Sequence, residues 1–186
     1  MNLKRISPLI LNELKQTASQ SPDPSTKCAA ILCEGERIIS RGFNRPFPEV
    51  SGTDIGKLSN RNYKINIMEH AECNCIRNIP VEFSRNCCNE NRVLKLTKIQ
   101  QIHSSTFMYI TSTPCLHCAI QIVKAGIRHV GIVDHNPDFT NESWGMLWKD
   151  AIEYLDKNGV EIIYYDRSGR IISRVEEGAI VPCARD

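Results

Sequence analysis

Two short segments, far apart in the chain, carry side chains that bind transition metals, and any fold must bring them together. His70 supplies an imidazole, and the segment Pro114–Cys118 supplies the thiols of Cys115 and Cys118. One imidazole and two thiolates form a three-ligand zinc site whose fourth tetrahedral position is open for a water molecule. Zinc lowers the pKa of such a water to about 7, so hydroxide is available at neutral pH. The sequence therefore predicts Zn²⁺ bound by His70, Cys115 and Cys118.

The two-cysteine segment is expected at the start of a helix. Thr113 is predicted to cap this helix, Pro114 to occupy its first position, and Gly126 to end it. Cys115 and Cys118 are then three residues apart on one helix face. The unpaired N–H groups and partial positive charge of a helix N-terminus lower thiol pKa values. Both cysteines are therefore expected to bind zinc as thiolates.

Glu72 follows His70 by two residues, near the start of a second helix expected over about residues 68–77. At this offset its carboxylate can lie beside a zinc-bound water, within the roughly 2.6–3.2 Å that proton transfer requires. The combined pattern H-x-E and P-C-x-x-C resembles the signature of zinc-dependent nucleobase deaminases. In that chemistry hydroxide attacks a ring carbon that bears an amine. Glu72 would take the water's proton and later protonate the ring nitrogen and the leaving ammonia.

A purely structural zinc is the alternative to an open, catalytic one. The side chains that could add a fourth ligand are Cys73, Cys75 and His117. A closed site, however, has no use for Glu72, which favours the catalytic interpretation. A second, structural zinc is conceivable at Cys87 and Cys88 with His103 nearby, although adjacent cysteines rarely bind one metal well.

Composition limits the other classes of function. Nine cysteines, an odd number in a chain of 186 residues, disfavour a disulfide framework and favour metal binding with buried thiols. A net charge of +2 and 6% aromatic residues make a polynucleotide-binding groove unlikely on composition. No secretory signal is apparent, and no apolar run approaches the roughly 20 residues that span a bilayer. We therefore expect a cytoplasmic location and no membrane contact.

Helices and strands are expected to alternate after an initial hairpin, which is typical of a layered α/β fold with a partly parallel sheet. Residues 79–104 are polar and hard to assign. The expected helices cover about residues 8–18, 68–77, 114–125 and 144–158, and the expected strands residues 28–33, 37–43, 106–111, 127–133 and 160–165. One domain is expected over 1–186, with a core at about 21–165, a loop or insertion at about 45–66 and a tail at about 166–186.

Several further segments resemble the deoxycytidylate (dCMP) deaminases of the cytidine deaminase superfamily. These segments are Ser21–Thr26, Arg37–Asn44, His70–Asn74, Met108–Ala119 and Gly126-Ile127. The resemblance implies a three-layer fold in which helices flank a mixed five-stranded sheet. It also implies hydrolytic conversion of dCMP to dUMP and ammonia, and a homo-oligomer, by family habit a hexamer. The alternatives are another cytosine nucleotide such as dCTP, a polynucleotide base, or a non-catalytic relative.

The resemblance also implies contacts to a small nucleotide. Asn44 would bind the sugar or the base, and the backbone around Ala71 would help to hold the pyrimidine. Guanidinium and ammonium groups suit a phosphate, and the candidates are Lys27, Arg45, Arg61 and Lys64. Each of these four charges could equally be a solvated surface group.

Two departures from the family pattern bear on regulation and local geometry. Regulated members carry G-Y-N-G in a site that responds to dCTP and dTTP, whereas this chain has Gly42-Phe43-Asn44-Arg45. Such regulation does not follow for this chain, and Arg45 is a candidate for either an effector phosphate or the substrate phosphate. Cys28-Ala29-Ala30 replaces the usual V-G-A, and alanine restricts the backbone more than glycine does.

Overall fold

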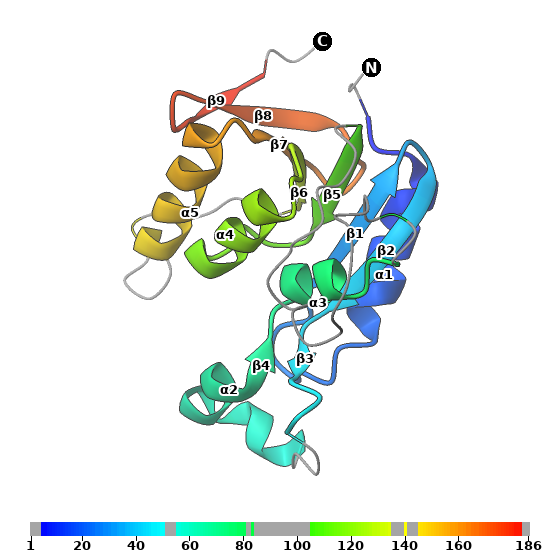
Figure 1. Cartoon of the computed structure of the whole chain (residues 1–186), viewed down its shortest axis with the longest axis vertical. Coiled ribbons are helices and arrows are strands. Elements are labelled where there is room, and N and C mark those ends of the chain that lie inside the picture. The colour runs from blue at the N-terminus through cyan, green and yellow to red at the C-terminus, as the bar shows by residue number, and fades with distance from the viewer. Residues whose placement is uncertain are drawn as a thin grey trace, which may run out of the picture.

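A single mixed sheet with helices on both faces forms the body of the molecule, and a small arm extends from it (Figure 1). The computed structural model describes residues 5–50, 55–80, 83, 105–134, 140 and 145–183. In spatial order, the strands are β2 (Arg37–Phe43), β1 (Ala29–Glu34), β5 (Thr106–Ile110), β6 (His129–Val133), β7 (Glu161–Tyr165), β8 (Ile171–Glu176) and β9 (Ala179–Pro182). The helices are α1 (Pro8–Ser19), α2 (Arg61–Ile67), α3 (Ala71–Arg77), α4 (Leu116–Lys124) and α5 (Gly145–Lys157), with a 3₁₀ turn, η1 (Ile55–Ser59).

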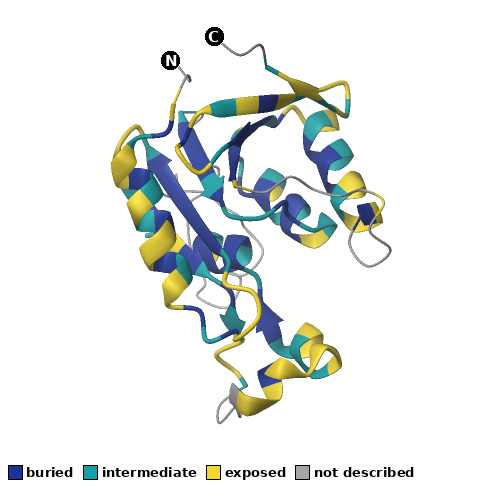
Figure 2. Ribbon diagram, turned by 180° about the vertical axis from the view of Figure 1, so that it is seen from behind, coloured by how far each residue is buried: buried dark blue, intermediate teal, exposed yellow. Residues whose placement is uncertain are grey.

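The sheet separates two hydrophobic clusters, which makes the fold a three-layer one. In β1, Ala30 and Leu32 belong to the cluster beneath α3, α4 and α5, whereas Ile31 and Cys33 belong to the cluster beneath α1. Successive residues of a strand point to opposite faces, so one short apolar strand serves both clusters. Figure 2 shows β1 as buried along its length, while the outer faces of the helices are exposed. The expected α/β three-layer architecture is confirmed.

The central strands are parallel and the outer ones antiparallel. β5, β6 and β7 pair in parallel, whereas β1 pairs antiparallel with both β2 and β5. α4 connects β5 to β6, and α5 connects β6 to β7, as parallel neighbours require. This order places the loop after β5 and the start of α4 at the carboxyl edge of the parallel strands.

The sheet has seven strands, not the five expected, because the C-terminal tail contributes β8 and β9. β8 pairs antiparallel with β7, and β9 pairs with β8. Val175 and Ile180 from these two strands pack against the larger hydrophobic cluster. The tail is therefore an integral part of the sheet rather than an appendage to it.

Residues 45–66 are not simply a loop. The arm comprises residues 45–69: β3 (Arg45–Pro46) and β4 (Met68–Glu69) form its two-stranded base, and η1 and α2 lie beyond them. Asn60 caps α2 by accepting a hydrogen bond from the Tyr63 amide at 3.2 Å. α2 has no buried residue, so it lacks the apolar periodicity that identifies a helix in a sequence.

Both helices that follow the predicted metal ligands begin later than expected. α3 begins at Ala71 rather than at Met68, because Met68 and Glu69 pair with the opposite strand of the arm. α4 begins at Leu116, so the predicted cap at Thr113 and the predicted first position of Pro114 are wrong. His70 and Cys115 themselves occupy the two N-cap positions.

Gly42 brings β2 against α3. A Cβ atom at residue 42 would overlap the carbonyl oxygen of Ala71 and the backbone of Cys75. Next to this contact, the Ser40 hydroxyl donates to the Cys75 carbonyl at 2.6 Å, and the Phe43 amide donates to the Asn74 side chain at 3.1 Å. These interactions fix α3, and with it His70, relative to the sheet.

Candidate metal and catalytic site

Two of the three candidate metal ligands, His70 and Cys115, occupy helix N-cap positions. His70 and Cys115 both have extended backbone angles (φ −74°, ψ 155° and φ −79°, ψ 167°), and neither side chain makes a capping hydrogen bond. Their carbonyl groups accept the first helical bonds, from the amides of Asn74 and Ala119 at 2.9 Å. The backbone thus completes both caps and leaves the imidazole and the thiol for another partner.

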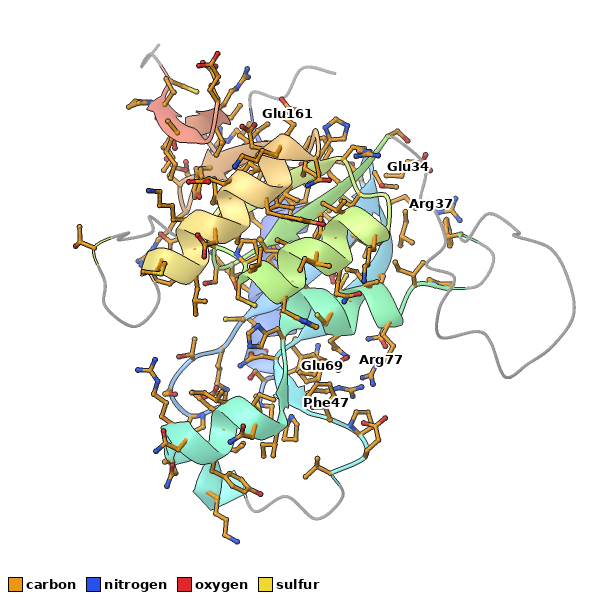
Figure 3. The ribbon with its side chains drawn as sticks, turned by 60° about the vertical axis from the view of Figure 1, so that its left-hand side comes forward. Glu34, Arg37, Phe47, Glu69, Arg77 and Glu161 are labelled. Atoms are coloured by element: carbon orange, nitrogen blue, oxygen red, sulfur yellow. The ribbon has the colours of Figure 1, made fainter. Side chains whose placement is uncertain are left out.

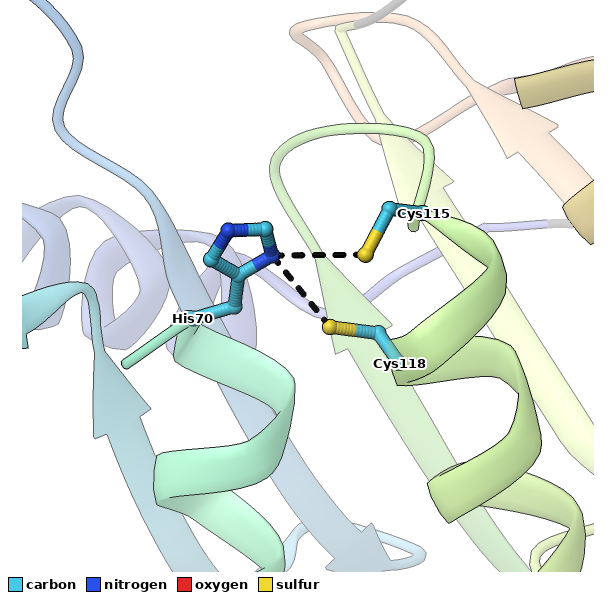
Figure 4. Close-up of side chains that lie close together, drawn as sticks. All are labelled: His70, Cys115 and Cys118. Atoms are coloured by element: carbon cyan, nitrogen blue, oxygen red, sulfur yellow. Dashed lines mark hydrogen bonds between the residues drawn. The ribbon is translucent and has the colours of Figure 1, made fainter. Parts of the chain in front are cut away.

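The imidazole and the two thiols converge across the gap between α3 and α4 (Figure 4). His70 Nδ1 lies 3.5 Å from Cys115 Sγ and 3.4 Å from Cys118 Sγ, and the three atoms lie within 4.8 Å of one another. Zinc bound tetrahedrally, with Zn–S near 2.3 Å and Zn–N near 2.0–2.1 Å, separates its ligand atoms by roughly 3.5–3.8 Å. The spacing and the chemistry of these donors fit Zn²⁺.

Electrostatics prepare this cluster for a metal. The pKa of Cys115 is lowered to about 4 by hydrogen bonds from Cys118 and His70, although burial opposes the shift. The hydrogen bond to Cys115, supported by the charge of Glu72, raises the pKa of His70 to about 9. Hydrogen bonds with Cys115 and Cys73, together with burial, raise the pKa of Cys118. A thiolate, the form that binds metals, is therefore present in the cluster at neutral pH.

Glu72 lies in the first turn of α3 and is buried. Burial raises the pKa of its carboxyl group, and the positive charge of His70 opposes this shift. A buried carboxyl group with a raised pKa holds a proton more readily than an exposed one, which suits a group that accepts and returns protons. Glu72 therefore has the burial and the charged neighbours that suit a proton-transfer residue.

The side chains proposed to close the site do not complete it within the described residues. Cys73 Sγ lies 3.8 Å from Cys118 Sγ, but the mutually close ligand atoms there belong only to His70, Cys115 and Cys118. Cys75 is buried with its Sγ 3.7 Å from the Ser40 hydroxyl, and His117 is exposed. The second zinc considered at Cys87, Cys88 and His103 lies outside the described residues.

Asn44 does not simply face a ligand, because its amide organises the loop between α1 and β1. Its Oδ1 accepts from the Cys28 amide at 2.7 Å, and its Nδ2 donates to the Thr26 carbonyl at 2.8 Å and to Asp23 Oδ2 at 3.3 Å. Both amide protons are used, and one lone pair of Oδ1 is left. Any contact of the Asn44 side chain with a ligand is limited to accepting one hydrogen bond.

The two lysines proposed for a phosphate have protein partners. Lys27 Nζ donates to the Ser19 carbonyl at 3.3 Å. Lys64 Nζ lies 2.9 Å from Asp23 Oδ2 and donates to the Ser25 hydroxyl at 2.8 Å. Asp23 is buried and was missed by the sequence analysis, although aspartate before serine and threonine is a known signal for an Asx turn.

Arg45 belongs to a cluster of two arginines and one carboxylate. Glu69 is buried, and its Oε2 lies 2.6 Å from Arg77 Nη2 and 3.7 Å from Arg45 Nε. Figure 3 shows Glu69 and Arg77 side by side at the base of the arm. Two guanidinium groups share one carboxylate, so the cluster has one excess positive charge. Arg61 is exposed at the start of α2, and Ala71 is buried at the start of α3.

A three-layer α/β sandwich that holds one imidazole and two thiols at facing helix starts is characteristic of the zinc-dependent deaminases. The chain belongs to the family defined by the cytidine and deoxycytidylate deaminase zinc-binding region, whose model matches residues 8–133. Within the described residues, no helix has the length and apolarity needed to cross a bilayer.

Two known proteins illustrate how far the similarity extends. The chain is 27% identical over 146 residues to an uncharacterized deaminase encoded in the luxG 3′ region of Aliivibrio fischeri, covering 78% of this chain and 84% of that one. The fold matches the crystal structure of dCMP deaminase from cyanophage S-TIM5 in complex with dCMP and dUMP, with a TM-score of 0.53 and 18% identity, covering 86% of this chain and 98% of that one. The second likeness concerns the fold alone.

Proposed function

We propose that this protein is a zinc-dependent hydrolase that converts free dCMP to dUMP and ammonia. The observation that carries the proposal is the pairing of a three-ligand site, His70, Cys115 and Cys118, with the buried carboxyl group of Glu72 on the same helix start. Membership of the deaminase family supports the reaction class. The S-TIM5 enzyme, which shares the fold, binds dCMP and dUMP.

Glu72 is the proton carrier in the proposed reaction. Bound zinc would supply the Lewis acidity that activates a water for attack on C4 of the cytosine ring. Glu72 accepts one proton of that water and delivers it to ring N3. It then accepts the proton of the new C4 hydroxyl group and transfers it to the amine, so that the C4–N bond breaks, ammonia leaves and a C4 carbonyl remains. The low exposure of Glu72, 6%, excludes bulk water from this proton relay.

The backbone and Asn44 are proposed to hold the nucleoside. The backbone at Ala71 lies between the metal-binding His70 and Glu72, so it adjoins the reacting edge of the pyrimidine. The free lone pair of Asn44 Oδ1 suits a sugar hydroxyl, which donates a hydrogen bond, better than it suits a phosphate, which only accepts.

Arg45 is proposed as the phosphate ligand. It follows Asn44 directly, its side chain is 34% exposed, and Glu69 is shared with Arg77, so one positive charge remains for an anion. Arg61, which is exposed at the start of α2, and Lys27, which lies just before β1, are second choices. The substrate assay described next also tests how many phosphate groups the preferred nucleotide carries.

A side-by-side assay decides the substrate. The zinc-loaded protein is incubated with dCMP, dCTP, CMP and deoxycytidine, and loss of the cytosine absorbance is followed. We expect dCMP to have the highest kcat/KM. Turnover of none of the four by fully zinc-loaded protein would refute the proposal, and a preference for dCTP would reassign the substrate. A homo-oligomeric state and a cytoplasmic location stay predictions.

A further inference from the structure

The loop between α1 and β1, residues 21–28, borders the catalytic site. Its last residue, Cys28, is close enough to Glu72 that burial and then the Glu72 charge raise the pKa of its thiol to about 12. The next residue, Ala29, exchanges hydrogen bonds with Thr111, which precedes the metal-binding cysteines: its amide donates to Oγ1 at 2.9 Å, and its carbonyl accepts from the Thr111 amide at 3.1 Å. Hydrogen bonds therefore link the end of this loop to the segment that leads to Cys115 and Cys118.

Asp23 is the centre of this loop. The carboxylate is 2% exposed, and Oδ1 accepts hydrogen bonds from the amides of Ser25 and Thr26 at 2.9 and 3.1 Å and from the Ser25 hydroxyl at 2.9 Å. Oδ2 accepts from Asn44 Nδ2 at 3.3 Å. A buried carboxylate with this many donors fixes the conformation of the backbone around it.

The charge that balances Asp23 comes from the arm. Lys64 Nζ lies 2.9 Å from Asp23 Oδ2 and 3.2 Å from Oδ1, and it also donates to the Ser25 hydroxyl at 2.8 Å. The Lys64 side chain is 19% exposed. α2, which carries Lys64, has no buried residue, so polar contacts such as this one attach it to the body. In Figure 1 the blue segment after α1 descends beside β3 and β4 toward the arm.

We propose that Lys64 is a positioning residue: its ion pair with Asp23 clasps the arm to the 21–28 loop and so holds Asn44 and Cys28 in the geometry that binds the substrate. This inference rests on the proposed function for its kinetic readout. The Lys64 ammonium is neutralised by a nearly inaccessible carboxylate, which leaves no net charge for a phosphate. Loss of the ammonium leaves Asp23 buried and unpaired, which is costly, so the loop is expected to rearrange.

The test compares three arm variants. Lys64→Met removes the charge and keeps the length, Lys64→Arg keeps the charge, and Lys57→Met removes an exposed charge from η1 in the same arm as a control. For zinc-loaded Lys64→Met we expect KM for dCMP to rise about tenfold with kcat within about twofold, the pattern of lost ground-state binding. Lys64→Arg should recover most of the loss, and Lys57→Met should match the wild type.

Two readouts separate a clasp from a direct phosphate ligand. If Lys64 acts through Asp23, the single variant Asp23→Asn has the same raised KM, and combining it with Lys64→Met adds little further. If Lys64 instead contacts the phosphate, the two effects multiply, and the inference is overturned. The second readout is hydrogen exchange of the Ser25 and Thr26 amides, which should lose about tenfold protection in Lys64→Met and none in Lys57→Met.

Hydrogen exchange also separates this inference from the proposed function. If the wild-type protein does not turn over dCMP, the proposed substrate is wrong, yet the amides of Ser25 and Thr26 still report whether Lys64 holds the loop. Unchanged protection of both amides in Lys64→Met overturns the clasp whatever the substrate is. Zinc content, measured for every variant, is expected to equal that of the wild type.

Discussion

Cys73 Sγ lies 3.8 Å from Cys118 Sγ, which places a third thiol against one of the candidate metal ligands. Cys73 is nevertheless not among the three side chains whose ligand atoms lie within 4.8 Å of one another. The difference matters because a fourth protein ligand makes a zinc site structural, whereas an open position makes it catalytic. The role of Cys73 therefore discriminates between the two kinds of site.

We expect Cys73→Ser to keep one zinc per chain and most of the activity. Cys118→Ser is the matched control, because it removes a ligand from the same cluster and should lose both zinc and activity. Metal analysis after dialysis, followed by the dCMP assay, provides the measurement. Loss of zinc from Cys73→Ser to the same extent as from Cys118→Ser would show a closed, four-ligand site and would remove the basis for the proposed reaction.

Replacing the carboxyl group of Glu72 should separate metal binding from chemistry. Because Glu72 is proposed to move protons and not to bind zinc, Glu72→Gln should retain zinc while kcat falls by about 10²–10⁴-fold, the usual contribution of a general acid–base group. Glu161→Gln is the control, since Glu161 lies at the amino end of β7 and pairs with His129 at 3.0 Å (Figure 3). Equal rates for the two variants would exclude the proposed role of Glu72.

The close approach of β2 to α3 predicts a distinctive effect of a single methyl group. In Gly42→Ala the new Cβ overlaps the backbone of Ala71 and Cys75, so α3 has to move and carry His70 with it. We expect the free energy of unfolding to fall by about 1–3 kcal/mol, as for other overpacked sites. Zinc binding should weaken at least about tenfold.

Gly35→Ala provides the comparison for Gly42→Ala. Gly35 has φ +60° in the turn between β1 and β2, and nothing lies within 4 Å of a Cβ at that position. An alanine in this left-handed conformation should lower the free energy of unfolding by about 1–2 kcal/mol, while zinc affinity stays unchanged. Thermal unfolding and a zinc competition titration measure both effects. Zinc affinity that falls equally in both variants would mean that the Gly42 contact has no special influence on the site.

The candidate metal ligands were predictable from sequence because the features that define them are local. Cys115 and Cys118 are separated by less than one helical turn, and Glu72 follows His70 by two residues, so short sequence segments are enough to identify them. The exact helix starts were not predictable, since Met68 and Glu69 are extended only through their pairing with Arg45 and Pro46. Tertiary pairing of this kind overrides local preference.

The elements that sequence analysis missed share a different property. α2 exposes or half-exposes all of its residues, so no apolar stripe marks it. β8 alternates weakly, with only Ser173 buried, and its place in the sheet depends on contacts made by Val175 and Ile180. The buried pairing of Asp23 with Lys64 joins residues that are 41 positions apart. Such long-range polar contacts leave no periodic pattern.

The Asp23 carboxylate should also give the protein a defined acid sensitivity. Burial alone would raise its pKa, but Lys64 and the donors of Ser25 and Thr26 outweigh that effect and hold the pKa below its ordinary value of 3.8. The folded state therefore binds fewer protons at this group than the unfolded state does. The resulting stability is fully present above pH 3.8 and is lost as the pH falls through the lower, folded-state pKa.

Asp23→Asn tests this sign directly. The free energy of unfolding, measured by urea titration, should be higher for the wild type than for Asp23→Asn at about pH 6. The difference should shrink toward about pH 3, because the Asp23 side chain of the unfolded chain is then mostly protonated and uncharged, as asparagine always is. Asp150→Asn, on the exposed side of α5, is the control and should show a difference that hardly varies with pH. A gap between wild type and Asp23→Asn that widens on acidification would contradict the stabilising ion pair with Lys64, because it would mean that ionised Asp23 destabilises the fold.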